Sequence, residues 1–231
     1  MSALRFISFV LLTCCPLSGF GFSDYTIAAH ILPSLNIASR VSDDLPFIVT
    51  RPVFSIGYNL EIAKKIKRYK VRLGVGVSGF GSKIVAKKTY GYDNLRIVSQ
   101  SISSHFLSVN LNGQRELIKM RNFDFAGFIG VSAAYIVNRS SNFGTNGSSL
   151  LNITHSSAST NEGIHIAPVA GIAMCRQFKK LYLESRLGYS LGLQQLTKDE
   201  YIVRESGISY PITTTNYGSS FFLSIGIGFR L

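Results

Sequence analysis

Large apolar side chains alternate with small or polar ones along most of this chain. The clearest case is Ser219–Leu231, where six large apolar residues occupy every second position from Phe221 onward. Successive side chains leave opposite faces of a β-strand, so a period of two predicts a strand with one apolar face. The other face of this predicted strand is mostly small or charged, from Ser224 to Arg230.

The same alternation recurs in seven earlier segments, so the sequence predicts eight strands. The earlier segments are Tyr25–Ala38, Val53–Ile62, Tyr69–Phe80, Ser104–Leu117, Arg121–Ile136, Gly163–Arg176 and Leu181–Leu193. Each is about ten residues or longer, the length of a tilted membrane-spanning strand. Pro33 lacks an N–H group, so we expect a bulge or a strand end at that position.

The connections between these strands alternate strictly between short and long. The short ones are Lys64–Arg68, Ile118–Met120 and Gln177–Lys180, and the long ones are Ser39–Pro52, Gly81–Ser103, Asn138–Glu162 and Gln194–Gly218. This alternation is typical of an all-β, eight-stranded, antiparallel up-and-down transmembrane barrel with short periplasmic turns and four longer extracellular loops. Both chain ends then fall on the periplasmic side.

The composition of the two strand faces indicates which of them meets lipid. The non-apolar face consists mainly of Gly, Ser, Ala and Asn, which suit the narrow interior of an eight-stranded barrel. We therefore expect the apolar face to point outward. A soluble lipocalin-like barrel is the alternative, and it requires the reverse orientation. Aromatic residues near strand ends fit either interfacial girdles or ordinary core packing.

Charged residues of both signs lie on the predicted inner face. We hypothesise that they form a polar plug, because enclosed charges are tolerable only when they are paired. The members of this proposed interior network are Glu61, Arg72, Glu116, Asp124, Glu184, Arg186 and Arg230. The alternative is that several of them lie in water near the barrel rims.

The formal net charge of +12 does not by itself indicate a nucleic-acid partner. The basic residues gather in short clusters, Lys64–Arg68, Lys87-Lys88 and Lys179-Lys180, each beside an alternating segment. Such clusters at strand ends are typical of solvated turns, so no nucleic-acid binding is predicted.

The first residues predict a cleaved secretory signal. A positive start at Met1–Arg5 precedes a short apolar core at Phe6–Thr13 and a small-residue stretch at Pro16–Ser23. We expect residues 1–23 to be removed and residues 24–231 to form the barrel domain. Lipidation at Cys14 is an alternative. Cleavage leaves Cys175 as the one cysteine, so no intramolecular disulfide is expected.

The candidate chemistry is sparse. His155-Ser156 lies in a Ser- and Asn-rich stretch where a mobile turn is the plain interpretation, and His105 and Ser108 fall on opposite faces of a strand. His165 and Cys175 share a face but lie roughly 33 Å apart along a strand, which excludes a joint metal site. We therefore predict no enzyme activity, metal or cofactor.

The pattern from Tyr25 to Leu231 resembles the small outer-membrane β-barrel proteins of Bacteroidota-like bacteria, a porin-family type of domain. The resemblance rests on three features: Phe54–Ile62 with its Asn-Leu-Glu end and basic turn, the Gly-rich strand Val71–Gly81, and the terminal Gly-x-Gly-Phe element at Gly226–Phe229. Such barrels commonly end on Phe or Tyr, whereas this chain ends on Leu231.

The resemblance implies a bacterial outer-membrane protein with a structural or surface-interaction role, binding through its extracellular loops. The alternatives are a small solute-conducting porin, a lipid-modifying outer-membrane enzyme and the lipocalin-like carrier. The expected partners are outer-membrane lipid and lipopolysaccharide, the barrel-assembly machinery through the C-terminal strand, and an extracellular ligand. A monomer is expected.

Overall fold

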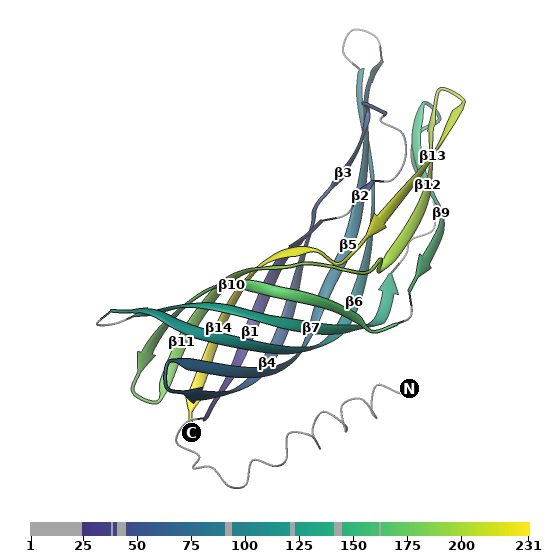
Figure 1. The fold of residues 1–231 in the computed structure, drawn as a ribbon. Coiled ribbons are helices and arrows are strands. Elements are labelled where there is room, and N and C mark those ends of the chain that lie inside the picture. The colour runs from purple at the N-terminus through teal and green to yellow at the C-terminus, as the bar shows by residue number, and fades with distance from the viewer. Residues whose placement is uncertain are drawn as a thin grey trace.

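The part of the chain that the structure describes is built almost entirely of antiparallel strands (Figure 1). The computed structural model describes residues 25–37, 39–40, 45–90, 94–120, 123–140, 145–161 and 163–231. The predicted signal segment, residues 1–23, lies outside these ranges. Within the described residues, no helix is long and apolar enough to cross a membrane.

Eight strands form one closed ring. They are β1 (Tyr25–Asn36), β4 (Val53–Ile66), β5 (Tyr69–Tyr90), β6 (Asn94–Lys119), β7 (Asp124–Ser140), β10 (His165–Phe178), β11 (Leu181–Ser190) and β14 (Ser220–Arg230). Each pairs antiparallel with its two neighbours, and the β1–β14 and β5–β6 pairings complete the circle. The prediction of an eight-stranded up-and-down antiparallel barrel is confirmed.

The first strand runs straight through its proline, so the expected bulge or strand end at Pro33 is wrong. The pairs Ile31–Ile225 and Ser34–Phe222 lie on either side of Pro33 and keep one register between β1 and β14. On its other side, Pro33 lies opposite Ile56 of β4. Proline lacks only the N–H, and the neighbouring pairs on both sides hold the strand in place.

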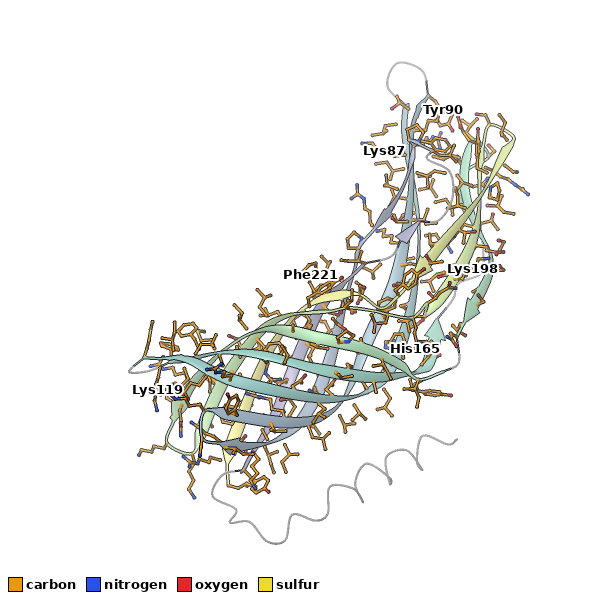
Figure 2. All side chains as sticks on the ribbon, viewed as in Figure 1. Lys87, Tyr90, Lys119, His165, Lys198 and Phe221 are labelled. Atoms are coloured by element: carbon orange, nitrogen blue, oxygen red, sulfur yellow. The ribbon has the colours of Figure 1, made fainter. Side chains whose placement is uncertain are left out.

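The large apolar rows face outward around the ring. Ile129 is 72% exposed, Leu60 66% and Phe54 64%, and Phe221, labelled in Figure 2, is 52% exposed. A protein in water does not leave whole rows of such side chains uncovered. Because a lipocalin-like barrel would bury these rows, the alternative of a soluble carrier is wrong.

Inside the barrel, large side chains lie against glycines of the neighbouring strand. A Cβ added at Gly226 would overlap the His30 ring, and one added at Gly228 would overlap the Tyr182 ring. An eight-stranded barrel has room only for its own side chains. The glycines on the inner face therefore make the space that the bulky residues fill.

Two of the short connections between ring strands are tight turns. Two residues join β4 to β5, and two join β10 to β11. Lys67 and Lys179 adopt the left-handed backbone in these turns, with φ of 56° and 52°. We refer to this end of the barrel as the short-turn end.

The four long connections are mostly strands rather than loops, which corrects the sequence-based expectation. They contain β2 (Ser39–Arg40), β3 (Ile48–Arg51), β8 (Thr145–Gly147), β9 (Leu151–Thr160), β12 (Thr197–Glu205), β13 (Ile208–Asn216) and the extended ends of β5 and β6. We call this assembly the crown. A five-stranded sheet, β2-β13-β12-β9-β8, stands opposite β3 and the ends of β5 and β6 (Figure 1).

The crown has an apolar core of its own. The members of this core are Ile48, Ile84, Ala86, Val98, Ile102, Leu151, Ile153, Tyr201, Val203 and Ile212. They come from both sides of the crown, from β3, β5 and β6 on one side and from β9, β12 and β13 on the other. Burial of these side chains stabilises the crown as a folded unit above the barrel.

Candidate functional site

A cluster of charged side chains fills the middle of the barrel. β4 supplies Glu61, β5 supplies Arg72, and β11 supplies both Glu184 and Arg186, and strand alternation directs all four inward. Their exposed fractions are between 2% and 6%. Charges removed from water to this degree persist only when partners satisfy them. We call these four residues the lumen network.

Each carboxylate of the lumen network contacts both arginines. Arg186 donates two hydrogen bonds to Glu61, at 2.7 and 2.5 Å, and a third to Glu184 Oε2 at 3.0 Å. Arg72 Nη1 donates to Glu184 Oε2 at 2.7 Å and to Glu61 Oε2 at 3.3 Å. Two positive and two negative groups therefore neutralise one another, and paired, charge-assisted bonds of this kind are the strong ones.

Uncharged polar groups surround the lumen network. Asn59 donates to Glu61 Oε1 at 2.7 Å, and Gln114 accepts from Arg72. Arg186 Nη2 lies 3.2 Å from His30 Nε2, and His30 Nδ1 lies 3.0 Å from Ser224 Oγ. If the guanidinium donates to Nε2, the ring proton is on Nδ1, where it can bond the serine.

Three further residues that contact the network, His30, Asn59 and Gln114, were not predicted from the sequence. All three stand on the polar face of an alternating strand, which is the signal that could have found them. A histidine or an amide carries no formal charge at neutral pH, so these residues do not stand out in a pattern of charged positions.

The other three residues of the hypothesised interior network lie closer to the short-turn end. Glu116 Oε2 is 3.6 Å from Lys65 Nζ. Asp124 is half-buried and pairs in register with Lys119 and Cys175, and Arg230 is exposed at the end of β14. The structure thus brings four of the seven charges together and places Glu116, Asp124 and Arg230 near the rim.

The lumen network lies between two cavities. One cavity, of about 160 Å³, opens toward the crown and includes Glu61 and Arg186 in its lining, with Phe106, Phe128 and Phe222 on its walls. The other, of about 120 Å³, lies at the short-turn end and includes Arg72. Because the two cavities meet the network from opposite sides, the network divides the lumen.

A second polar cluster joins the crown to β5. Asp199 of β12 lies 3.6 Å from His155 Nε2, 3.4 Å from Thr197 Oγ1 and 3.5 Å from Ser82 Oγ. All four side chains are buried. The sequence suggested a mobile turn at His155, which is wrong, because His155 lies in β9 and packs against the Tyr201 ring.

An ion pair on the outside of the crown links its two sides. Lys88 of β5 pairs with Glu205 of β12, and the Lys88 ammonium lies 5.1 Å from the centre of the Phe47 ring. The hydrogen bond to Glu205 raises the pKa of Lys88. The Lys88 side chain is 38% exposed, whereas that of Glu205 is only 10% exposed, so the pair lies at the edge of the crown with its carboxylate covered.

The closed ring, the outward apolar rows and the charge-filled centre define the class of this protein as a transmembrane β-barrel protein. In a bilayer every backbone N–H and C=O group must be bonded within the protein, and a closed antiparallel sheet meets that demand. The eight strands, two tight turns at one end and long connections at the other are the features of this class.

Comparison with known proteins gives similar structures but no family assignment. No family model matches the chain, and no curated protein matches it. The solved structure of the outer membrane protein OprG from Pseudomonas aeruginosa is 8% identical, with a TM-score of 0.49, over 90% of this chain and 97% of that one.

Two further solved structures are similar. The outer membrane protein AlkL is 16% identical, with a TM-score of 0.42, over 92% of this chain and 93% of that one. The outer membrane protease OmpT from Escherichia coli is 9% identical, with a TM-score of 0.43, over 92% of this chain and 98% of that one.

Proposed function

We propose that this protein acts in the bacterial outer membrane as a structural or surface-interaction protein. Its barrel is the anchor, and its crown presents a contact surface outside the cell. The observation that carries this proposal is the lumen network, whose four mutually paired charges fill the middle of the barrel. A barrel filled in this way is suited to hold a platform rather than to pass solutes.

The energetics of the network support a closed lumen. Opening a path through the barrel requires separating Arg186 from Glu61 and Arg72 from Glu184 in a region where little water is available. Breaking a buried pair by removing one partner costs about 3–5 kcal/mol, because the remaining charge is left uncompensated. Thermal opening by that route is rare.

The crown is suited to recognition because it is folded and still exposes apolar side chains. Ile97 is 60% exposed, Ile208 59% and Leu95 48%, and all three lie in the crown, on the extended end of β6 or at the start of β13. A rigid scaffold that presents accessible side chains is how many proteins position a binding surface. We propose an extracellular macromolecule as the partner of this surface.

The strand that closes the ring supports a further part of this proposal. β14 pairs with both β1 and β11, so the barrel is complete only when the last strand is in place. We propose that the barrel-assembly machinery engages this strand during insertion, and that the inserted protein is a monomer surrounded by lipid.

A small solute-conducting pore is the second candidate. The cavities of about 160 and 120 Å³ on either side of the lumen network favour it, because a displaced network would connect them. Conductance in planar bilayers distinguishes the candidates. If the barrel is a closed anchor, the wild-type protein should show no conductance, and the variant Arg72→Ala/Arg186→Ala should form channels. Steady conductance of the wild-type protein would support the pore.

The placement of the crown outside the cell is tested by surface labelling. In a Cys175→Ser background, Arg204→Cys in the crown and Lys179→Cys in a short turn are expressed and treated with a membrane-impermeant maleimide. We expect intact cells to label Arg204→Cys alone, and lysed cells to label both variants. If intact cells label Lys179→Cys alone, the short turns lie outside the cell. That result would contradict the proposed role of the crown.

A further inference from the structure

Basic side chains lie over aromatic rings where the lipid-facing wall ends, at the short-turn end of the barrel. The Arg115 guanidinium lies 5.9 Å from the centre of the Tyr69 ring, and that of Arg176 lies 4.8 Å from the Phe178 ring and 5.2 Å from the Phe123 ring. Lys64 Nζ lies 5.2 Å from the ring of Tyr25, which is buried, whereas Tyr69 and Phe178 are exposed. We call Lys64, Arg115 and Arg176 with these rings the cation–aromatic belt.

The three cations of the belt point outward, not into the lumen. Lys64 continues the row of Leu60 and Ile62, Arg115 that of Leu111, and Arg176 that of Ile172 and Met174, each at the even spacing that keeps one strand face. Those apolar residues are between 38% and 66% exposed. The belt therefore lies where the apolar wall ends.

The excess of basic over acidic residues is concentrated at the short-turn end of the barrel. Among the described residues, eleven basic side chains lie near the short turns but only two acidic ones, Glu116 and Asp124. The cations are Lys64, Lys65, Lys67, Arg68, Lys70, Arg115, Lys119, Arg176, Lys179, Lys180 and Arg230. By contrast, the sequence of the four crown connections carries nine basic and seven acidic residues.

We propose that the cation–aromatic belt binds the head groups of anionic phospholipids in the leaflet that surrounds the short turns. This inference rests on the proposed membrane placement. Arginine and lysine donate charge-assisted hydrogen bonds to phosphate oxygens. Aromatic rings settle at the level of the head groups, and long basic side chains extend from an apolar wall to that level.

The neighbouring charges favour an anionic over a zwitterionic lipid. Lys119, labelled in Figure 2, lies at the end of β6 close to the belt, and Lys179 and Lys180 form the β10–β11 turn beside Phe178. A zwitterionic head group has no net charge, so the surplus of basic residues near the short turns does not attract it. A head group with net negative charge is attracted by every one of these residues within a Debye length.

The proposal is tested by the lipids that the folded barrel retains. The protein is reconstituted with equal amounts of phosphatidylglycerol and phosphatidylcholine, and retained lipids are counted by native mass spectrometry. The belt variant is Lys64→Gln/Arg115→Gln/Arg176→Gln. The control variant, Arg51→Gln/Lys87→Gln/Arg204→Gln, removes the same charge from the crown. Arg176→Gln alone is measured in the same way.

We expect the wild type and the control variant to retain phosphatidylglycerol over phosphatidylcholine severalfold. The belt variant should lose at least two thirds of that preference, and Arg176→Gln part of it. No preference in the wild type, or equal loss in the belt and control variants, would overturn the proposal. Equal retention of soluble glycerophosphoglycerol would also overturn it, because the ligand would then be a free anion.

A gel comparison of unheated and heated protein separates failure of this proposal from failure of the proposed function. A folded membrane barrel that migrates differently when unheated, but has no lipid preference, contradicts the belt alone. Identical migration of both wild-type samples contradicts the membrane barrel, and the lipid site with it.

Discussion

At the scale of single residues, the barrel interior is organised by pairs of one large and one small position. His30 and Ser224 are in contact, and His30 also covers Gly226 on the same neighbouring strand. Arg186 lies over Glu61 across the lumen. Strand alternation predicts which side chains point inward, but not which of them meet, because contacts across a lumen depend on strand stagger and barrel closure.

Removal of Arg186 is the first prediction at this scale. Arg186→Ala leaves the Glu61 carboxylate without its two bonds from Arg186, so we expect the free energy of unfolding to fall by about 3–5 kcal/mol. Urea unfolding in lipid vesicles measures the change. The double variant Glu61→Gln/Arg186→Gln removes both charges and should lose less. A single variant as stable as the wild type would show that the network is not tightly coupled.

The second prediction concerns the space above Gly226. Gly226→Val places a branched side chain against His30, and overpacking of this kind costs about 1–3 kcal/mol. The same unfolding assay should show partial rescue when His30→Ala is added. Gly113→Val is the control, because a Cβ there meets nothing closer than a carbonyl oxygen at 3.9 Å. Equal effects at Gly226 and Gly113 would contradict the packing described.

At the scale of elements, the alternation of exposed and buried residues predicts the barrel strands but not the crown. Alternation along β5 stops at Gly79–Ser82, where consecutive residues are buried because the crown sheet covers the face that was exposed below. Asn216 of β13 donates to the Gly81 carbonyl at 3.2 Å and joins the two parts there. A strand buried on both faces shows no apolar–polar rhythm, so the sequence suggested that a loop begins at Gly81.

The third prediction tests whether the crown is a folded unit. Ile153→Ala removes a fully buried side chain from the crown core, and such a change costs about 2–5 kcal/mol locally. We expect limited proteolysis to cut the crown faster while the barrel stays protected. Ile208→Ala, at a 59% exposed position, is the matched control. Equal cleavage of the two variants would contradict an independent crown core.

At the scale of the whole molecule, the sequence contained most of the barrel and little of the crown. The eight strands, their order and the outward direction of the apolar rows follow from alternation and from connection length. The contacts among Glu61, Arg72, Glu184 and Arg186 do not follow, since they join strands that are far apart in sequence. The crown core likewise joins β3, β5, β6, β9, β12 and β13.

The lipid exposure of successive residues on one strand tests the central claim most directly. Spin labels are placed singly at positions 131–134 of β7 in lipid vesicles, and their accessibility to oxygen and to a water-soluble relaxation agent is compared. We predict high oxygen accessibility at Val131 and Ala133, on the outward face, and low accessibility at Ser132 and Ala134, which line the lumen cavity. A flat profile, or the reverse pattern, would contradict a barrel with hydrocarbon outside and a polar filling inside.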